Sequence, residues 1–213
     1  MKEAMHYKIP AAFWELKTVE SLKLKMFLGP LEISTGVGGK MIALTKLTLK
    51  ECDKLGPIPS ALWELVGLTE LTLEECGLTG ILDSEIGNLV RLRCLNVAEN
   101  NLEGSIPSEL GLLTDLEELD LGSNMFSGVI PASVGSLINL TSLSLEYNRL
   151  SGSIPAELSN LVRLSKLYLS ENKLKGEVPL EFQHLVNLEV INLSGNPGLC
   201  CAFQFPDSGR AYL

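Results

Sequence analysis

The stretch LRCLNVAENNLEGSIPSELGLLTD, residues 92–115, decides the fold of this chain of 213 residues. Its apolar residues follow neither the period of a long helix nor the strict alternation of a hairpin. Leucine instead recurs every 24 residues in both directions from Leu92, at Leu44, Leu68, Leu116, Leu140, Leu164 and Leu188. A fixed period of this length predicts a stack of repeated units.

Each unit opens with a pattern that predicts a short strand. In L-x-x-L-x-L, Leu95 and Val97 alternate with Asn96 and Ala98, as residues on the two faces of a strand do. One such strand cannot bury its own apolar face, so successive units must stack as parallel strands about 4.8 Å apart, with a right-handed return path. The sequence therefore predicts one elongated solenoid domain.

A polar residue follows the predicted strand at one fixed offset. The position holds asparagine in five units and cysteine in two: Asn100, Asn124, Asn148, Asn172, Asn196, Cys52 and Cys76. A carboxamide both donates and accepts hydrogen bonds, so stacked asparagines can form a ladder that satisfies backbone groups where the chain bends inward. We expect Cys52 and Cys76 to occupy this ladder as buried free thiols, although stacked neighbours about 5 Å apart also permit a disulfide by distance.

The second half of the unit carries the motif L-x-G-x-I-P. It is present as LEGSIP at 102–107 and LSGSIP at 150–155, and with small changes as FSGVIP at 126–131 and LKGEVP at 174–179. The chain thereby resembles the plant-type leucine-rich-repeat proteins, which include ectodomains of receptor-like kinases, receptor-like proteins and polygalacturonase-inhibiting proteins. The resemblance implies an α/β-class right-handed solenoid, or horseshoe, with a parallel concave β-sheet and short 3₁₀ turns on the convex side. It also implies a non-enzymatic binding module without a cofactor.

The two ends depart from the repeat. Residues 1–18 match the back half of a unit, residues 19–196 form the array of units of about 24 residues, and residues 197–213 are expected to be a remnant of a C-terminal cap or a tail. Members of this family usually begin with a cysteine-bearing cap, and no counterpart stands at the start of this sequence. Without it, we expect an exposed apolar edge that favours self-association through the N-terminal end. That edge would comprise Ile9, Phe13, Trp14, Leu22 and Leu24.

Charge and residue types exclude several classes of function. The net charge of -9 argues against a nucleic-acid partner, which needs a basic face. The histidines are His6 and His184, neither near a candidate nucleophile, and the five cysteines have no metal-binding spacing. We therefore expect neither enzymatic activity nor a metal.

The family resemblance and the N-terminal sequence point to different compartments. The resemblance implies an extracellular or plasma-membrane-associated protein, but residues 1–18 lack the apolar segment of a secretory signal, and no run is long enough to span a membrane. Asn139-Leu-Thr and Asn192-Leu-Ser are possible glycosylation sites, both at offsets expected to be exposed. An intracellular scaffold and an inhibitor of a secreted enzyme are alternative functions to a receptor-like recognition module.

The outward positions of the predicted strands change charge along the array. Lysines come first, at Lys23, Lys25, Lys46 and Lys50. Acidic residues follow, at Glu70, Glu74, Glu75, Glu99, Glu117, Glu118, Asp120 and Glu146, with Tyr147 and Tyr168 beside them. Glu51, Glu75 and Glu99 share one column, where like charges on neighbouring strands repel each other. A solvated face tolerates such repulsion, and a basic peptide or protein surface bound there would relieve it, which is our hypothesis for the ligand.

Overall fold

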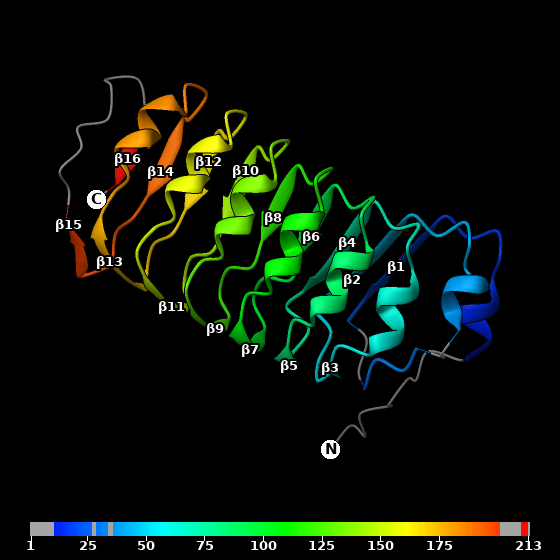
Figure 1. The fold of residues 1–213 in the computed structure, drawn as a ribbon. Helices are drawn as coiled ribbons and strands as arrows, with labels where there is room; N and C mark the ends of the chain where they lie inside the picture. The colour runs from blue at the N-terminus through cyan, green and yellow to red at the C-terminus, as the bar shows by residue number, and fades with distance from the viewer. Residues whose placement is uncertain (1–10, 27–28, 34–35, 201–209, 213) are drawn as a thin grey trace, which may run out of the picture.

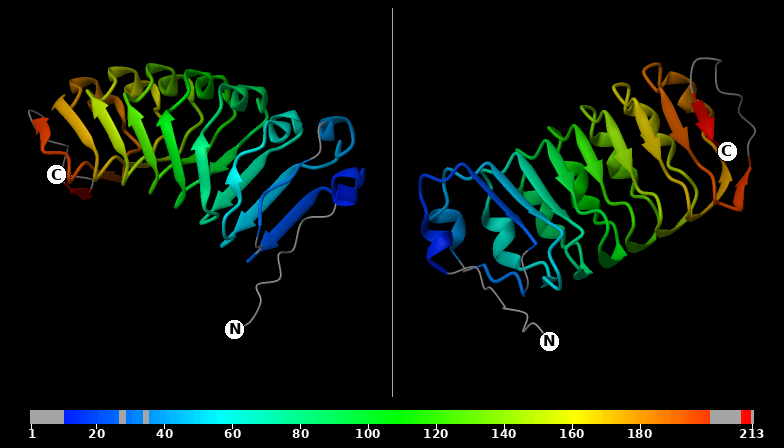
Figure 2. Two further views of the ribbon diagram at one scale, coloured as in Figure 1. Left: turned by 90° about the horizontal axis from the view of Figure 1, so that it is seen from below. Right: turned by 180° about the vertical axis from the view of Figure 1, so that it is seen from behind.

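The computed structural model describes residues 11–26, 29–33, 36–200 and 210–212. These residues form a curved solenoid in which strands line one side and short helical turns line the other (Figure 1; Figure 2). Leu95, Leu119, Leu143 and Leu167 stack in register on neighbouring strands. The predicted solenoid and its 24-residue spacing are confirmed.

The concave side is a parallel sheet built from the L-x-x-L-x-L segments. Its strands are β1 (Ser21–Lys25), β2 (Lys46–Lys50), β4 (Glu70–Glu74), β6 (Cys94–Asn96), β8 (Glu118–Asp120), β10 (Ser142–Ser144), β12 (Lys166–Tyr168), β14 (Val190–Asn192) and β16 (Arg210–Tyr212). Each strand pairs in parallel with the next, and the pairing of Ser21 with Lys46 accommodates the one 25-residue step between units. The sheet thus places one strand from every unit on a common face.

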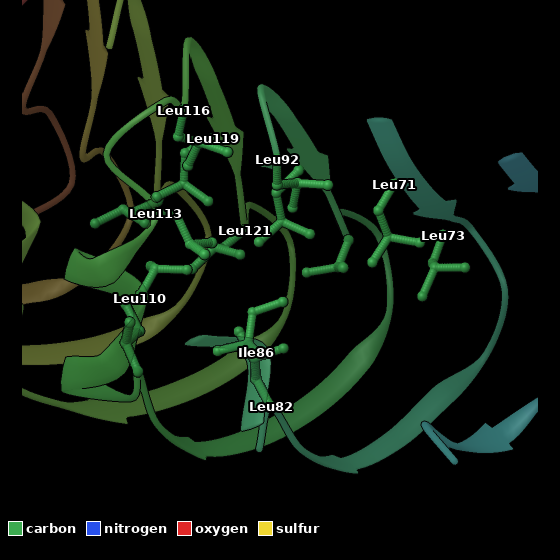
Figure 3. Close-up of a cluster of buried hydrophobic side chains, with 14 of the residues drawn as sticks. Leu71, Leu73, Leu82, Ile86, Leu92, Leu110, Leu113, Leu116, Leu119 and Leu121 are labelled. Atoms are coloured by element: carbon green, nitrogen blue, oxygen red, sulfur yellow. The ribbon is translucent and has the colours of Figure 1, made fainter. Parts of the chain in front are cut away.

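The core lies between this sheet and the return path. The inward leucines of the strands from β2 to β12, such as Leu71, Leu119 and Leu143, are at most 1% exposed. Leu110 and Leu113 from the return path meet them from the other side (Figure 3). Burying each such side chain contributes about 1.5–3 kcal/mol, so the stability of the array is spread over all its units.

A second parallel sheet, which the sequence analysis did not anticipate, runs along the L-x-G-x-I-P segments (Figure 1). Its strands are β3 (Gly56–Pro57), β5 (Leu78–Ile81), β7 (Asn101–Ser105), β9 (Met125–Gly128), β11 (Arg149–Gly152), β13 (Lys173–Glu177) and β15 (Gly198–Cys200). The motif glycine has a φ of 79° at Gly80, Gly104, Gly128 and Gly152. Residues with a side chain rarely adopt this positive φ, which explains why the motif has glycine at this position.

The convex turns are 3₁₀ helices, and the described residues contain no α-helix. They are η1 (Ala11–Glu15), η2 (Val37–Gly39), η3 (Ser60–Glu64), η4 (Ser84–Asn88), η5 (Ser108–Leu112), η6 (Ala132–Ser136), η7 (Ala156–Asn160) and η8 (Leu180–His184). The motif proline precedes most of them with φ near the value that its ring imposes, for example −68° at Pro107 and −63° at Pro155. The proline therefore fixes where each turn begins.

The first described unit is more closed than expected. The Trp14 side chain is fully buried, and its Nε1 donates a hydrogen bond of 2.8 Å to the carbonyl oxygen of Glu32. Leu22 is only 8% exposed, whereas Phe13 is 39% exposed. The expectation that Trp14 and Leu22 lie on an exposed apolar edge was wrong, because both side chains pack into the hydrophobic core and the carbonyl oxygen of Glu32 accepts the indole hydrogen bond. Ile9 lies outside the described residues.

The C-terminal residues extend both sheets. β15 pairs with β13, and β16 pairs with β14. Cys200 is an exposed free thiol, and Cys201 lies outside the described residues. The division of the chain at residues 18 and 196 remains a prediction.

Candidate functional site

A column of buried asparagines supports the concave face along one edge. The Nδ2 of Asn100 donates a hydrogen bond of 2.7 Å to the Leu73 carbonyl oxygen of the preceding unit, and its Oδ1 accepts bonds of 3.0 Å from the N–H groups of Cys76 and Leu78. Asn124, Asn148, Asn172 and Asn196 donate in the same way to the preceding unit. These bonds fix the end of each strand relative to its neighbour.

Cys52 and Cys76 occupy the same column as free, buried thiols. The Cys76 thiol donates hydrogen bonds of 3.3 Å to the Leu49 carbonyl oxygen and 3.1 Å to the Glu74 carbonyl oxygen. Burial is the main cause that raises the pKa of Cys76 to about 12. The thiol is therefore neutral at physiological pH and acts as a hydrogen-bond donor.

The residue before each ladder position adopts a left-handed backbone conformation. Its φ lies between 52° and 57° at Glu75, Glu99, Ser123, Tyr147 and Glu171, all of which are exposed. This geometry turns the chain from the strand toward the buried ladder residue. The predicted residues Glu75, Glu99 and Tyr147 thus lie on one rim of the concave face, and Glu171, which the sequence analysis omitted, shares their offset.

Ion pairs between strands neutralise much of the charge on the first units of this face. Lys46 contacts Glu70 at 2.6 Å, Lys50 contacts Glu74 at 2.5 Å, and Lys25 contacts Glu51 at 2.7 Å. Arg93 contacts Glu117 at 3.3 Å. The expected repulsion at Glu51 is therefore offset by Lys25, and Glu70, Glu74 and Glu117 already have cationic neighbours.

The acidic residues of the next units have no such neighbours among the described residues. Glu118 and Asp120 project from β8, and Glu146 follows β10. Their contacts are neutral: the Ser170 hydroxyl donates to Glu146 at 2.9 Å, and the Gly122 N–H donates to Asp120 at 2.9 Å. Their negative charge is left for solvent or a ligand.

Small residues form the floor beside these carboxylates. Ser142 and Ser144 of β10 lie between Glu118 and Asp120 of β8 on one side and Lys166 and Tyr168 of β12 on the other. The face is thus lined by small side chains over β10, with carboxylates on the β8 side and a lysine and a tyrosine on the β12 side. The sequence prediction considered only charged and aromatic residues on the concave face and therefore omitted these serines. The alternation of outward and inward residues along each strand also places Ser142 and Ser144 on this face.

Cys94 lies on the same face, on β6. Its thiol donates to a Glu118 carboxylate oxygen at 3.8 Å. Burial, followed by the nearby charges of Glu118 and Glu70, raises the pKa of Cys94 to about 11. The thiol therefore stays protonated at neutral pH and is a poor nucleophile.

Both sequon asparagines are partly exposed and already hydrogen-bonded, and their glycosylation stays a prediction. Asn139 donates to the Thr114 carbonyl oxygen at 2.9 Å and accepts from Arg163 at 2.9 Å. Asn192 on β14 donates to the Ser170 hydroxyl at 3.2 Å. Stacking of adjacent units provides these partners, which a single unit does not reveal.

The sequence matches the family model for a leucine-rich repeat region over residues 47–198. The chain belongs to the leucine-rich-repeat family. No curated protein sequence matches it significantly.

This leucine-rich-repeat chain is similar in structure to ectodomains of plant receptors. The plant peptide hormone receptor RGFR1, solved in complex with RGF2, is 31% identical with a TM-score of 0.80, over 90% of this chain and 30% of the receptor. The ectodomain of the Arabidopsis thaliana receptor kinase GASSHO1/SCHENGEN3, in complex with CASPARIAN STRIP INTEGRITY FACTOR 2, is 32% identical with a TM-score of 0.76, over 90% of this chain and 26% of the receptor. This chain spans less than a third of either receptor.

The same repeat architecture occurs in a protein of another kind. A plant ice-binding protein is 29% identical with a TM-score of 0.67, over 78% of this chain and 62% of that one. The repeat fold is typical of non-enzymatic binding modules, but it does not fix what is bound.

Other features of the leucine-rich-repeat array do not suggest chemistry. An open groove of about 640 Å³ lies away from the concave face, along the second sheet, and is lined by residues including Ile81, Pro107 and Val129. Within the described residues, no group of three His, Cys, Asp or Glu side chains could hold a metal ion. None of the helices described has the length and apolar character needed to cross a bilayer.

Proposed function

We propose that this leucine-rich-repeat chain is a recognition module whose concave face binds a peptide or protein with a basic surface. The observation that carries the proposal is the contrast between two parts of one sheet. Glu70, Glu74 and Glu117 are paired with lysine or arginine, whereas Glu118 and Asp120 have no cationic partner among the described residues.

Uncompensated carboxylates favour a cationic ligand for an electrostatic reason. Two opposite charges about 4 Å apart near a protein surface attract each other by roughly 4 kcal/mol before the cost of desolvation. The carboxylates that are already paired offer much less, because a ligand must first replace their lysine or arginine. The proposed contacts therefore centre on β8 and β10 and extend to Glu99 and Glu146, while Glu70, Glu74 and Glu117 contribute little.

The shape of the same region suits an extended ligand side chain. Ser142 and Ser144 leave space above β10, and Tyr168 stands beside that space. Tyr147 on the rim is 57% exposed. Tyrosine rings stack on guanidinium groups and contribute strongly to protein interfaces, so arginine is the favoured ligand residue.

The position of Lys166 limits the extent of the proposed site. It follows Glu118 and Ser142 in one column of the concave sheet, and it is exposed. A basic ligand that crossed β12 at this level would be repelled, which places the ligand over β8 and β10. A receptor role is supported by similarity to the receptors named above, which were solved in complex with RGF2 and with CASPARIAN STRIP INTEGRITY FACTOR 2.

The experiment compares two double variants with the same change in net charge. Glu118→Lys with Asp120→Lys alters the proposed site, and Glu103→Lys with Glu181→Lys alters exposed carboxylates on β7 and η8, away from the concave face. Fluorescence anisotropy of a labelled arginine-rich peptide measures binding, with a Gly-Ser peptide of equal length as the neutral probe.

We expect the site variant to bind the arginine-rich peptide at least tenfold more weakly and with less dependence on salt. The control variant should bind within about twofold of the wild type. Equal losses in both variants would show that only net charge matters, and would remove the concave face from the function.

A further inference from the structure

A row of exposed aliphatic side chains runs along the array outside the concave face. It occupies one position in each unit, two residues before the leucine that opens the next unit, where a 3₁₀ turn leads into a strand of the concave sheet. We call it the aliphatic ridge: Ile42, Val66, Val90, Ile138, Val162 and Val186. Their exposed fractions range from 48% to 81%. Thr114, also β-branched and exposed, completes the row between Val90 and Ile138.

The backbone holds this ridge in a repeated conformation. The N–H groups of Thr114, Ile138, Val162 and Val186 each donate a 2.9 Å hydrogen bond to the carbonyl oxygen two residues earlier. The carbonyl oxygen of Thr114 in turn accepts from Asn139, and that of Val162 accepts from Asn187. The ridge is thus pre-organised, and covering it would cost little conformational entropy.

Internal packing does not explain these residues. Each ridge residue directly follows a buried apolar residue, such as Met41, Leu65 or Leu89, that already fills the core. Single exposed valines are common on protein surfaces, but seven β-branched residues in line form a continuous strip, and large exposed apolar strips mark interaction sites.

Charges beside the ridge indicate what covers it. Arg91 and Asp115 follow Val90 and Thr114 directly, both are exposed, and neither forms an ion pair among the described residues. The net charge of -9 opposes an anionic membrane surface, and it also opposes a second copy unless opposite charges face each other locally. A second ridge running in the opposite direction meets that condition in one register. When the six positions from Ile42 to Val162 are paired and Val186 is left beyond the end, Arg91 faces Asp115 of the second copy.

We propose that two copies of this chain associate through their aliphatic ridges, antiparallel, about a twofold axis between Val90 and Thr114. Val90 then meets Thr114 of the partner subunit, and Arg91 meets Asp115 of the partner subunit. Twofold symmetry generates the salt bridge twice. The same register places Val66 against Ile138 of the partner subunit.

The size of the contact fits a modest dimer. Six units about 4.8 Å apart make a strip roughly 25 Å long, and one flanking column on each side brings the contact to about 18 residues per copy. Stable interfaces use about 20–30 residues on each side, so this contact falls just below that range and we expect a weak dimer. The contact leaves the strands of the concave sheet free and does not depend on the proposed ligand.

Sedimentation velocity tests the proposal on the full chain, from low micromolar to several hundred micromolar protein. The wild type should shift from monomer to dimer over this range. Val90→Lys should abolish the shift from monomer to dimer. The matched control Val129→Lys should retain this shift, because Val129 has a similar exposed fraction, 59%, but follows β9 of the second sheet, outside the ridge. Far-UV circular dichroism and a urea midpoint check that each variant is folded.

A charge swap tests the register. Arg91→Asp and Asp115→Arg should each weaken the dimer at least tenfold, and the double variant should return to within about threefold of the wild type. A wild type that stays monomeric, a Val129→Lys control as impaired as Val90→Lys, or a double variant that is not rescued would overturn the proposal. Association through the β1 edge would leave all the ridge variants dimeric, which would also overturn it.

Discussion

At the scale of single residues, the ladder shows why asparagine and cysteine share one position. Asn148 accepts a hydrogen bond from the Phe126 N–H at 2.9 Å and donates to the Leu121 carbonyl oxygen at 3.0 Å, so it serves two groups of the preceding unit. The Cys76 thiol donates to the Leu49 carbonyl oxygen but is a weak acceptor. Both side chains can donate a hydrogen bond to a backbone carbonyl oxygen, but only the carboxamide is also a strong hydrogen-bond acceptor.

This difference predicts the cost of breaking the ladder. Asn148→Ala should lower the free energy of unfolding by about 1–3 kcal/mol, because it leaves a buried N–H and a buried carbonyl without partners. Arg149→Ala, at the adjacent exposed position, should change it by less than about 0.5 kcal/mol. Urea denaturation measures both values, and equal midpoints would contradict the role of the ladder.

At the scale of elements, the convex side depends on how closely the 3₁₀ turns stack. A methyl group added at Gly135 of η6 would collide with the backbone carbonyl of Glu157 in η7, and one at Gly111 of η5 would lie 2.5 Å from the Ser133 carbonyl oxygen. Neither glycine has a positive φ. The turn glycines are therefore required for close approach between elements, not for an unusual backbone conformation.

Gly135→Ala consequently should destabilise the protein by about 1–3 kcal/mol through overpacking. Gly39→Ala is the matched control, since Gly39 also lies in a 3₁₀ helix, without a positive φ, and a methyl group there would have no atom within 4 Å. Thermal unfolding of the two variants tests the expectation: a Gly135 variant as stable as the Gly39 variant would mean that the turns can separate at no cost.

At the scale of the whole molecule, a solenoid is stabilised unit by unit, so its ends are its weakest parts. β1 pairs only with β2 among the described strands, whereas β10 is paired on both sides. Trp14 and η1 bury part of the first unit, but they add no second strand partner.

Hydrogen exchange should report this gradient. The amide of Leu22 should exchange at least tenfold faster than that of Leu143, which occupies the same position in a central unit. Exchange read out by NMR or mass spectrometry compares the two directly. Equal protection would mean that the array unfolds in a single step, without fraying from β1.

The residues that could be placed from the sequence are those that repeat. Leu95, Leu119 and Leu143 could be predicted as core residues because leucine recurs at this position from one unit to the next. The motif L-x-G-x-I-P led to the correct fold class. The strands of the second sheet were missed because each is only two to five residues long and does not alternate. Trp14 was placed on an exposed edge because nothing local shows that Glu32 supplies a partner for its indole N–H.

The sequence by itself determined the period, the strand positions, the buried leucines and the family, since these depend on spacing within one unit. Only the tertiary structure decided which carboxylates lack a cationic partner. Glu74 and Glu118 have the same residue type and both lie on the concave face, but Lys50 neutralises Glu74, while no cation among the described residues contacts Glu118. The tertiary structure also aligned Val66, Val90 and Ile138 in one exposed strip. The physical reason is that charge compensation and surface continuity arise between units, from side chains about 24 residues apart that stacking brings within a few ångströms of each other.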